Sequence, residues 1–593
     1  MHGLLMGILI GDIDSVEKET QENFRGSSLE HMLAVSGAHV SYVLLGSTYL
    51  LQKLKFSKKI SNSITIFLLL FFMALTGATP SVIRACIMAS YLIICKITYQ
   101  KPQILVSLTI PMLALLIQNP YSIFSSSLQL SYGGTIGILI FCKPLQIVFS
   151  EKFINLKEDS LEEEKTILKK MKNLKQKIIH KVIEMLTVTL SANLIVLPIM
   201  AKTFQTISIT FFISNLLASP ILGIVILLSP ILSLFLQILI NIASWGAKLP
   251  FSKSYIATPS LWVLILYYIF LFLIFYISYL KRKIRKRKFE KRILKMMEIL
   301  KKRKRRFFLC SLSVILIVTI FFSILPKDLK IYFIDVGQGD STLIITPRGK
   351  SVLIDGGGNR DTLQFDVGKQ ILLPYLLNRG ITKIDYIIPS HLDEDHVGGL
   401  LTILENLPVH YVIMTKQGKD SQNYQKLLEI VKRKNIKLIY VKIGDRINLD
   451  RQVNLEILWP KEEQITENIL NNNSIVCKLT YGSFSILFTG DIEEIAETAI
   501  LNTYTNKNIL QATVLKIAHH GSKSSSIEPF LETVNPKIAL IGVGEKNTFG
   551  HPNKGVIERL EKWNVDIYRT DIHGEISMVT DGKSYKIKKQ IQD

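Results

Sequence analysis

A short polar segment in the second half of the chain carries the residue types that bind metal ions. The sequence SHLDEDHVGGL places two imidazoles and two carboxylates close together, at His391, Asp393, Asp395 and His396. It follows the apolar run IDYIIPS, which is typical of a strand, and leads into an expected helix. In an extended turn, alternate residues project the same way, so this one peptide could supply ligands to two metal ions. An acidic turn without a metal is the alternative, and it explains less well why the segment stands between a strand and a pair of glycines.

Further candidate ligands follow other expected strands. Asp355 ends the run SVLID and precedes three glycines, and Asp491 ends the run FSILFTGD, where a carboxylate could bridge two cations. The run TVLKIAHHGS ends at His519 and His520. We expect His519 to be the ligand, because it follows the strand more directly than His520 does.

Two cations about 3.5 to 4 Å apart would polarise a phosphodiester, generate hydroxide and stabilise the leaving oxygen, which is nuclease chemistry. Lys516, Lys523 and His551 are candidate phosphate contacts or proton donors. Asp340, in the sequence DVGQGDS, could orient the site, although a turn-forming aspartate accounts for it equally well. The residues expected to act in catalysis are Asp340, Asp355, Asp395, His520 and His551.

These residues lie in a part of the chain with the pattern of a soluble α/β domain. Residues 327–593 alternate short β-branched runs with turns and amphipathic helices, whereas residues 36–326 hold long apolar runs. We expect about ten membrane spans in the first part. The runs cover residues 36–52, 62–78, 82–98, 103–118, 124–142, 182–201, 204–222, 223–245, 261–280 and 307–325.

Composition agrees with a membrane protein and gives its expected orientation. The 593 residues include 71 Lys and Arg against 48 Asp and Glu, and the mean hydropathy is +0.29. These values exclude a disordered tail protein and disfavour an ordinary cytosolic enzyme. Residues 327–593 hold 33 basic and 33 acidic residues, so the net charge of +23 belongs to the first 326. Five cysteines, four of them in or beside apolar runs, offer no disulfide framework.

The segment 281–306 has sixteen basic and two acidic residues between two expected spans. By the positive-inside rule it lies in the cytoplasm, and nucleic-acid binding is the less favoured alternative. The last span then leads outwards, so residues 327–593 are expected to be extracytoplasmic. Residues 1–35 are expected to be extracytoplasmic or interfacial lead-in helices.

Several polar residues stand within or next to the apolar runs. Arg84 lies in the third run, where a charge costs about 2.5 to 3.5 kcal/mol at mid-bilayer, so it should face a bundle interior or an aqueous path. Snorkelling from the helix start is the alternative. Gln129 and Asn215 could be pathway residues or helix-packing hydrogen bonds. The candidate transport path comprises His31, Ser36, Gly37, His39, Arg84 and Gln129.

The stretches HMLAVSGAHV, GATPSVIRACIMA, LQLSYGGTIGIL and SNLLASPILG resemble, in this order, the competence domain of the ComEC family of DNA-internalisation proteins. DVGQGDS and SHLDEDHVGGL resemble that family's usual C-terminal domain. The resemblance implies a multi-pass channel that carries one DNA strand across the bacterial cell membrane. A DNA receptor, a separate ATP-driven motor and a homo-oligomer are the partners to expect, since the chain has no P-loop. The OB-fold domain common in this family is not evident, which suggests a truncated product, a short branch or a separate subunit.

The C-terminal part also resembles the metallo-β-lactamase fold, an αββα sandwich. The resemblance implies that Asp355 is the first-motif acid, that the segment from His391 to His396 is the second motif, and that Asp491 bridges two ions. The usual HxHxDH reads HxDxDH, and no histidine stands between His410 and Asp491 for the third motif. Mn²⁺ or Mg²⁺ therefore becomes as plausible as Zn²⁺. The segment 471–474 could offer an amide oxygen or be only a turn.

Two alternatives to a nuclease stay open. The C-terminal domain could position DNA without cleaving it, because the third-motif histidine is missing. The chain could also be a membrane-anchored hydrolase of small substrates, although no hydrophobic lid is evident in the sequence.

Overall fold

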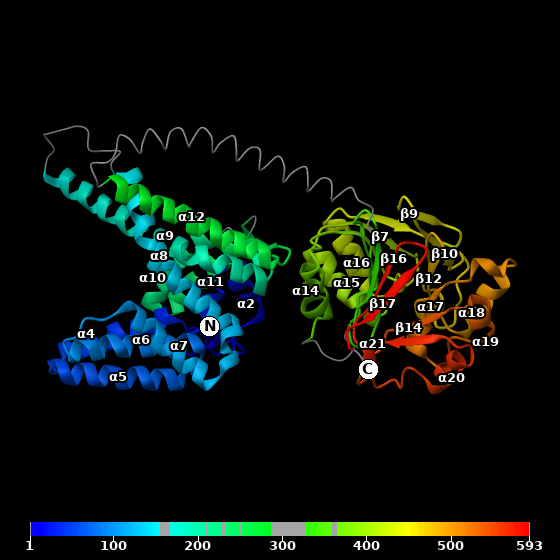
Figure 1. The fold of residues 1–593 in the computed structure, drawn as a ribbon, viewed down its shortest axis with the longest axis horizontal. Coiled ribbons are helices and arrows are strands. Elements are labelled where there is room, and N and C mark those ends of the chain that lie inside the picture. Colours follow the sequence, from blue (N-terminus) through cyan, green and yellow to red (C-terminus); the bar gives the residue numbers. More distant parts are fainter. Residues whose placement is uncertain are drawn as a thin grey trace. The chain divides into compact units, whose positions relative to one another are not determined.

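The computed structural model describes residues 2–154, 166–208, 210–227, 233–249, 252–285, 328–358 and 365–591. They form two compact units, Met1–Ile274 and Phe275–Asp593 (Figure 1). The first unit is helical and the second contains two large sheets. The predicted fold class, a helical membrane domain followed by an α/β sandwich, is confirmed.

The first unit is built from helices whose sequences are apolar on most faces. Their bounds are α1 (His2–Ile10), α2 (Lys18–Gly26), α3 (Glu30–Leu33), α4 (Gly37–Lys53), α5 (Lys58–Leu75), α6 (Pro80–Ile97), α7 (Ile104–Gln118), α8 (Ser126–Ile154), α9 (Thr166–Thr203), α10 (Phe211–Leu227), α11 (Ser233–Lys248) and α12 (Leu261–Arg285). Among the described residues, four helical stretches are long and apolar enough to cross a membrane. They lie in α5, α6, α8 and α9, and shorter apolar helices lie in α7, α11 and α12.

The outward faces of this unit are apolar. Between 17% and 33% of each long apolar stretch is buried inside the protein, and Phe67, Leu105 and Trp262 are each at least two-thirds exposed. A soluble protein rarely leaves so much contiguous apolar surface in water. These helices are therefore suited to contact with lipid chains.

Some expected spans differ from the helices observed. The run 204–222 starts with a strand, β1 (Thr206–Ile207), which pairs with β2 (Ser254–Tyr255), and its helix α10 begins only at Phe211. Gln205 adopts a left-handed backbone with φ of 55°, which turns the chain before the helix. The expected span 307–325 and residues 286–306 of the basic segment lie outside the described residues. The total of about ten spans stays a prediction.

The second unit contains two sheets that pack face to face. One has the strand order β17-β16-β3-β4-β5-β6-β7-β8 and the other β15-β14-β13-β12-β11-β10-β9. Their bounds are β3 (Leu329–Phe333), β4 (Thr342–Ile345), β5 (Ser351–Ile354), β6 (Ile384–Ile388), β7 (Val409–Met414), β8 (Lys437–Tyr440), β9 (Arg446–Asp450), β10 (Val453–Trp459), β11 (Val476–Tyr481), β12 (Phe484–Phe488), β13 (Val514–Lys516), β14 (Ile538–Ile541), β15 (Asp566–Arg569), β16 (Ile576–Thr580) and β17 (Tyr585–Lys589).

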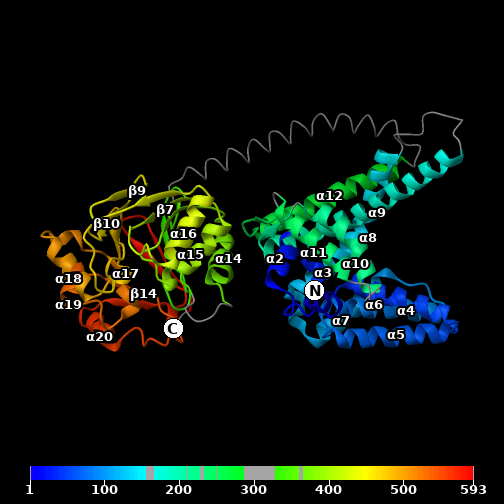
Figure 2. The same ribbon diagram turned by 180° about the vertical axis from the view of Figure 1, so that it is seen from behind.

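The core lies between the two sheets because their strands alternate apolar and polar residues. In β3, for example, Leu329, Ile331 and Phe333 point into the core while the residues between them are half-buried. Helices α14 (Leu373–Asn378), α15 (Glu394–Asn406) and α16 (Gln422–Arg433) cover one side of the sandwich, and α18 (Glu494–Thr503), α19 (Glu528–Val534) and α20 (Lys554–Lys562) cover the other (Figure 2).

Strand direction brings many loops to one edge of the sandwich. β5 to β8 run parallel, as do β12 to β15, so the loops that follow them leave at the carboxyl ends of the strands. The loop between β3 and β4 joins this edge because Thr342, at the start of β4, pairs with Ile354, at the end of β5. Ligand sites of open α/β sheets form at such edges.

Candidate metal centre

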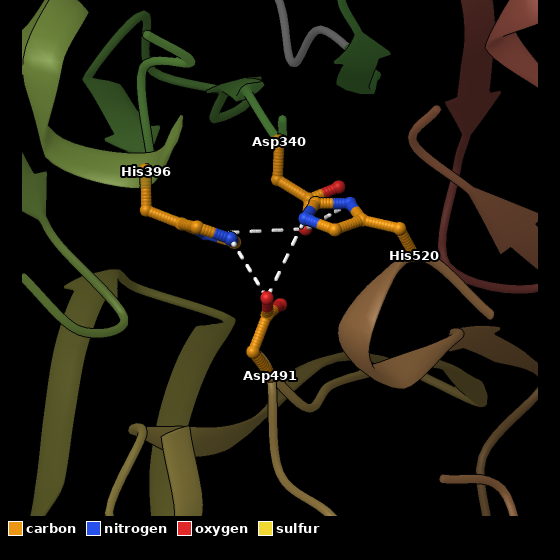
Figure 3. A group of neighbouring side chains, drawn as sticks. All are labelled: Asp340, His396, Asp491 and His520. Carbon is orange, nitrogen blue, oxygen red and sulfur yellow. Dashed lines mark ion pairs between the residues drawn. The ribbon is translucent and has the colours of Figure 1, made fainter. Parts of the chain in front are cut away.

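Four buried side chains converge at the edge where the two sheets meet. Asp340, His396, Asp491 and His520 each offer one ligand atom, and these atoms lie within 4.8 Å of one another (Figure 3). Oδ2 of Asp491 is 3.2 Å from Nε2 of His396 and 3.4 Å from Nε2 of His520. Two imidazole nitrogens and two carboxylates at this spacing form a donor set for a divalent cation.

Each of these residues comes from a different element. Asp340 lies in the loop between β3 and β4, and His396 lies in the first turn of α15. Asp491 follows β12 and His520 follows β13. Gly542, after β14, packs on Asp340 so closely that a β-carbon there would collide with Oδ1 of that aspartate. Four loops and the first turn of α15 therefore close around the cluster.

Both histidines have one ring nitrogen fixed by a protein acceptor. Nδ1 of His396 lies 3.0 Å from Oδ2 of Asp355, whose Oδ1 accepts a 2.7 Å hydrogen bond from the amide of Ser390. Nδ1 of His520 lies 2.7 Å from the carbonyl oxygen of Gly542. The Nε2 atoms of both rings are buried without a hydrogen-bond partner, and both face Asp491. This arrangement, with one nitrogen held and the other turned inwards, is the usual geometry of a metal-binding histidine.

The carboxylates of the cluster and its surroundings favour positive charge on the two histidines. Burial alone would lower the pKa of His396, but the Asp491 and Asp355 carboxylates raise it well above its usual value. His520 behaves in the same way, with its pKa raised by Asp491 and Asp340 against the effect of burial. Burial would raise the pKa of Asp491, yet His396 and His520 hold it well below its usual value. The site thus favours positive charge and fits a bound cation.

A lysine lies next to the cluster. Lys516, at the end of β13, is 5% exposed; its Nζ forms an ion pair with Asp340 and lies 3.7 Å from Oδ1 of Asp491. Nζ also donates a 3.1 Å hydrogen bond to the carbonyl oxygen of Gly490. Burial opposes its charge, but Asp340 and Asp491 raise the pKa of Lys516, so it stays an ammonium ion.

The other residues of the HLDEDH segment lie beside the cluster. Asp395 faces His520, with Oδ2 and Nε2 3.5 Å apart, and is therefore within reach of the same cation. His391 and Asp393 form a neighbouring pair, with Nε2 and Oδ2 3.6 Å apart. The His391 and His396 rings are 4.1 Å apart at their centroids. The segment is not an extended turn throughout, because α15 already begins at Glu394. A second cation, if bound, would have His391 and Asp393 as its own ligands.

The structure places His520, and not His519, in the cluster, so the preference for His519 is not supported. Both residues have left-handed backbones, with φ of 51° and 53°. These two successive residues turn the chain sharply after β13, so only the second imidazole faces Asp491. Nδ1 of His519 instead lies 3.4 Å from Oε1 of Glu493. Distance from the strand end was thus a poor guide in a turn of this kind.

The remaining candidates of this domain are distributed around the cluster. The His551 ring centroid is 5.8 Å from that of His519 and 6.4 Å from that of His520. Burial, with the two neighbouring imidazoles, lowers the pKa of His551 to about 4. Lys523 is exposed and lies outside the cluster. The segment 471–474 forms hydrogen bonds with neighbouring loops through Asn472, Asn473 and Ser474. For example, the amide of Asp491 donates to Ser474 Oγ.

The candidate path residues of the helical unit divide into two groups. Gly37, at the start of α4, lies beside Arg84 of α6, whose Nη1 contacts Oγ1 of Thr135 in α8. Gln129, in the first turn of α8, instead donates to the carbonyl oxygen of Ile123, in the short 3-10 helix that precedes α8. Thr135 was not among the predicted residues, and only the long-range pairing of α6 with α8 reveals it.

His31, Ser36 and His39 lie at the start of this unit. Nδ1 of His31 lies 3.2 Å from the carbonyl oxygen of Ser28. Ser36 is the N-cap of α4, and its amide donates to Nδ1 of the buried His39, a capping arrangement. Ser36 and His39 thus define where α4 begins.

Comparisons with known proteins agree with both units. Residues 8–281 match the competence protein family and residues 334–545 match the metallo-beta-lactamase superfamily. ComE operon protein 3 of Bacillus subtilis is 26% identical over 97% of this chain and 71% of its own length. Recombination protein 2 of Haemophilus influenzae is 29% identical over 45% of this chain and 31% of its own length.

Among solved structures, CmlA, a diiron beta-hydroxylase from Streptomyces venezuelae, matches 43% of this chain and 55% of its own, with 14% identity and a TM-score of 0.28. The similarity to known families is based on the two sequence matches and not on this structural match. Residues 8–281 of this chain are therefore similar to the competence protein family, and residues 334–545, which contain the buried Asp and His cluster, are similar to the metallo-beta-lactamase superfamily.

Proposed function

We propose that this protein carries single-stranded DNA through the cell membrane during natural transformation, and that its C-terminal domain hydrolyses the strand that is not transported. The observation that carries the proposal is the union, in one chain, of a competence domain with the buried Asp340–His396–Asp491–His520 cluster. When duplex DNA is the source and one strand is the cargo, a hydrolytic site would remove the strand that stays outside.

The cluster has the parts that phosphodiester hydrolysis requires. A bound divalent cation would polarise the phosphate and activate water. Asp355 holds the His396 ring in place, and Gly542 holds the His520 ring, so neither ligand must reorganise during the reaction. The Lys516 ammonium adds a fixed positive charge beside Asp491, where it would offset the negative charge that develops on a phosphate.

His551 is suited to contact a neutral or leaving group rather than to stabilise charge. With the pKa of His551 lowered to about 4, its imidazole is neutral at pH 7 and is a weak base there. It lies outside the ligand cluster but next to His519 and His520. We assign it a role as a hydrogen-bonding contact to the leaving group.

The charge distribution supports an extracytoplasmic position for this domain. The basic segment 281–306 favours the cytoplasm, and one further span would carry residues 327–593 outside. With 33 basic and 33 acidic residues the domain offers no general attraction to DNA. Contacts would be local, at Lys516 and Lys523. Of the cluster Lys432, Arg433 and Lys434, the second and third already engage Glu405.

Partners follow from what the chain lacks. No P-loop motif occurs in the sequence, so an ATP-driven motor would be a separate cytoplasmic protein. A receptor that delivers duplex DNA would act on the outer side. We include a homo-oligomer among the proposed assemblies.

Labelled-DNA uptake tests the proposal most directly. A strain without the gene should take up no DNA, and the wild-type gene should restore uptake. Asp491→Ala should abolish divalent-metal-dependent cleavage by the purified full chain, in Mn²⁺ and in Zn²⁺. Uptake that persists in the deletion strain would reject the transport role. An Asp491→Ala chain that cleaves DNA as fast as wild type would reject the nuclease role.

The two alternatives predict other results in the same assays. A wild-type chain that binds DNA and supports uptake but cleaves nothing with any metal would be a non-catalytic DNA-binding module. A chain that hydrolyses small esters and is dispensable for uptake would be a membrane-anchored hydrolase.

A further inference from the structure

Three helices of the membrane unit begin at the same end of the bundle. α4 begins at Gly37, α6 at Pro80 and α8 at Ser126. α6 and α8 run parallel, because Ser81 lies 3.3 Å from Ser131 and Arg84, one turn further on, contacts Thr135. The start of α4 lies against the second turn of α6. Helix N-termini carry a partial positive charge, so this end of the bundle attracts anions, although the Ser36–His39 pair already caps α4.

Arg84 adds a full positive charge at this point. The residue is 8% exposed, and its contacts are all with neutral groups. Nη1 contacts Oγ1 of Thr135 and lies 3.8 Å from Sδ of Met88, and the guanidinium carbon lies 5.5 Å from the centroid of the Tyr132 ring. Within the described part of the chain, no carboxylate forms an ion pair with Arg84. A buried charge with only neutral partners is costly, so an anion at this place would relieve the cost.

One edge of the guanidinium has a buried nitrogen that no described residue satisfies. Nε is buried without a hydrogen-bond partner, and the hydrogen bonds that Arg84 makes to described residues all come from Nη1. Nε and Nη2 form the edge that binds two oxygens of a phosphate or a carboxylate side by side. Nη2 lies 3.6 Å from the place where a β-carbon would stand at Gly37, so this edge is next to the N-terminus of α4. A side chain at residue 37 would contact Nη2 directly.

We propose that the Nε–Nη2 edge of Arg84 and the N-terminus of α4 bind a backbone phosphodiester of single-stranded nucleic acid inside the membrane unit. The inference rests on the proposed DNA-uptake function, which supplies the strand. A planar guanidinium suits a phosphodiester because two N–H groups match its two free oxygens, and a lysine cannot do the same. One such site would hold one phosphate at a time and let the strand advance by whole nucleotides.

Binding of a fluorescent single-stranded 12-mer to the full chain in lipid nanodiscs tests the proposal. EDTA in the buffer removes the contribution of the metal centre. Arg84→Gln should weaken binding about tenfold and reduce the slope of log affinity against log salt by about 0.7, the value for one phosphate contact on a single strand. Arg84→Lys should keep the slope and lose affinity, because the charge stays but the fork is lost. Lys96→Gln, an exposed charge removed from the same helix, is the matched control and should change neither.

A second measurement changes the strand instead of the protein, and its first comparison uses the wild-type chain alone. A 12-mer with a methylphosphonate at its central linkages has the same bases without those charges. It should bind the wild-type chain more weakly than the natural strand and should bind the Arg84→Gln chain with no further loss.

The outcomes separate the inference from the function on which it rests. A wild-type chain that binds no strand would overturn both. Strand binding whose salt slope is the same in wild type and Arg84→Gln would overturn the inference alone. The inference also fails if native mass spectrometry shows that Arg84→Gln loses bound phosphatidylglycerol while strand binding is unchanged, because the occupant would then be a lipid headgroup.

Discussion

Nδ1 of His396 lies 3.0 Å from Oδ2 of Asp355, while the other nitrogen of the same ring faces Asp491. Asp355 is therefore placed to orient a ligand without being part of the four-residue cluster. Carboxylates in this position fix the tautomer and the direction of a metal-binding imidazole. Asp355 follows strand β5, and His396 lies at the start of the helix that follows β6. The two residues are close because β5 and β6 are parallel neighbours, so both strands end at the same edge of the sheet.

Replacing Asp355 by alanine should weaken divalent-metal binding by roughly 10- to 100-fold while leaving the number of bound ions unchanged. The reason is that His396 stays in place but its ring is no longer held. Calorimetric titration of the full chain with Mn²⁺ measures both quantities. Asp420→Ala, an exposed carboxylate of the same domain, is the control. If Asp355→Ala eliminates one bound ion, then Asp355 is itself a ligand.

The two adjacent histidines should differ sharply. His520→Ala should remove most of the metal affinity, because Nε2 of His520 faces both Asp395 and Asp491. His519→Ala should keep most of it, because that ring faces Glu493. The two variants remove the same group from adjacent positions, so each controls for the other. Equal losses of bound metal in the two chains would contradict the geometry.

Much of the fold could be predicted from the sequence, and the limits lie where a contact joins distant loops. In runs such as IDYIIPS and FSILFTGD, an apolar stretch typical of a strand is followed directly by polar residues that can bind a metal. This pattern indicated that the candidate ligands lie where strands end, at the edge of a sheet. Asp340 could be suspected only as an orienting residue, since its neighbours in the cluster come from α15, β12 and β13. His520 rather than His519 faces the cluster because both residues have a left-handed backbone conformation. Two adjacent histidines in a sequence do not indicate such a conformation.

Metal binding should become tighter as the pH rises above 6.5. In the metal-free site the carboxylates raise the pKa of His396 and of His520, so both rings keep their second proton to a higher pH than a free histidine does. A cation must displace these protons, and its affinity therefore rises with pH until the rings are neutral. Titration at pH 7 in buffers of different ionisation enthalpy should show roughly one to two protons released per ion. Release of none would mean that the rings are already neutral without metal.

A buried glutamate in α18 should make the C-terminal unit less stable as pH rises from about 4.5 to about 7. Burial raises the pKa of Glu497 to about 7, although the amides of Ser526 and Ile527 donate to its carboxylate at 2.7 and 2.8 Å. Between its ordinary value of 4.5 and 7, the folded state holds more protons than the unfolded state, so stability falls with pH and is constant above. The loss is on the order of 3 kcal/mol.

Hydrogen exchange of peptides that cover residues 522–531, in the full chain in detergent, can detect this loss. Opening of that loop should become more frequent from pH 5 to pH 7 in wild type, after correction for intrinsic exchange, and Glu497→Gln should remove the trend. Glu494→Gln removes an exposed neighbouring charge that contributes least to the raised pKa of Glu497, so it should keep most of the trend. A trend that survives in Glu497→Gln would assign the pH dependence to another group.

Lys516→Met should change metal binding and DNA cleavage in opposite directions. The ammonium pairs with Asp340 and lies 3.7 Å from Asp491, so it competes with a cation for the same carboxylates. Methionine keeps a similar volume without the charge, and cation affinity should rise by about an order of magnitude or more. Cleavage should slow by roughly 10²- to 10³-fold, because a preorganised charge next to the reacting phosphate is lost.

If Lys516 had only a structural role, Lys516→Met would lower both the metal affinity and the rate of DNA cleavage. Opposite changes in these two quantities therefore distinguish an electrostatic role from a structural one. Lys478→Met provides the matched control, since this half-buried lysine of β11 donates to the carbonyl oxygen of Ile509 and faces no carboxylate of the cluster. Metal titration and cleavage of a labelled duplex, both with the full chain, give the two numbers. Tighter metal binding with undiminished cleavage would show that the lysine tunes the metal site alone, and the phosphate would then be held by other residues of the domain.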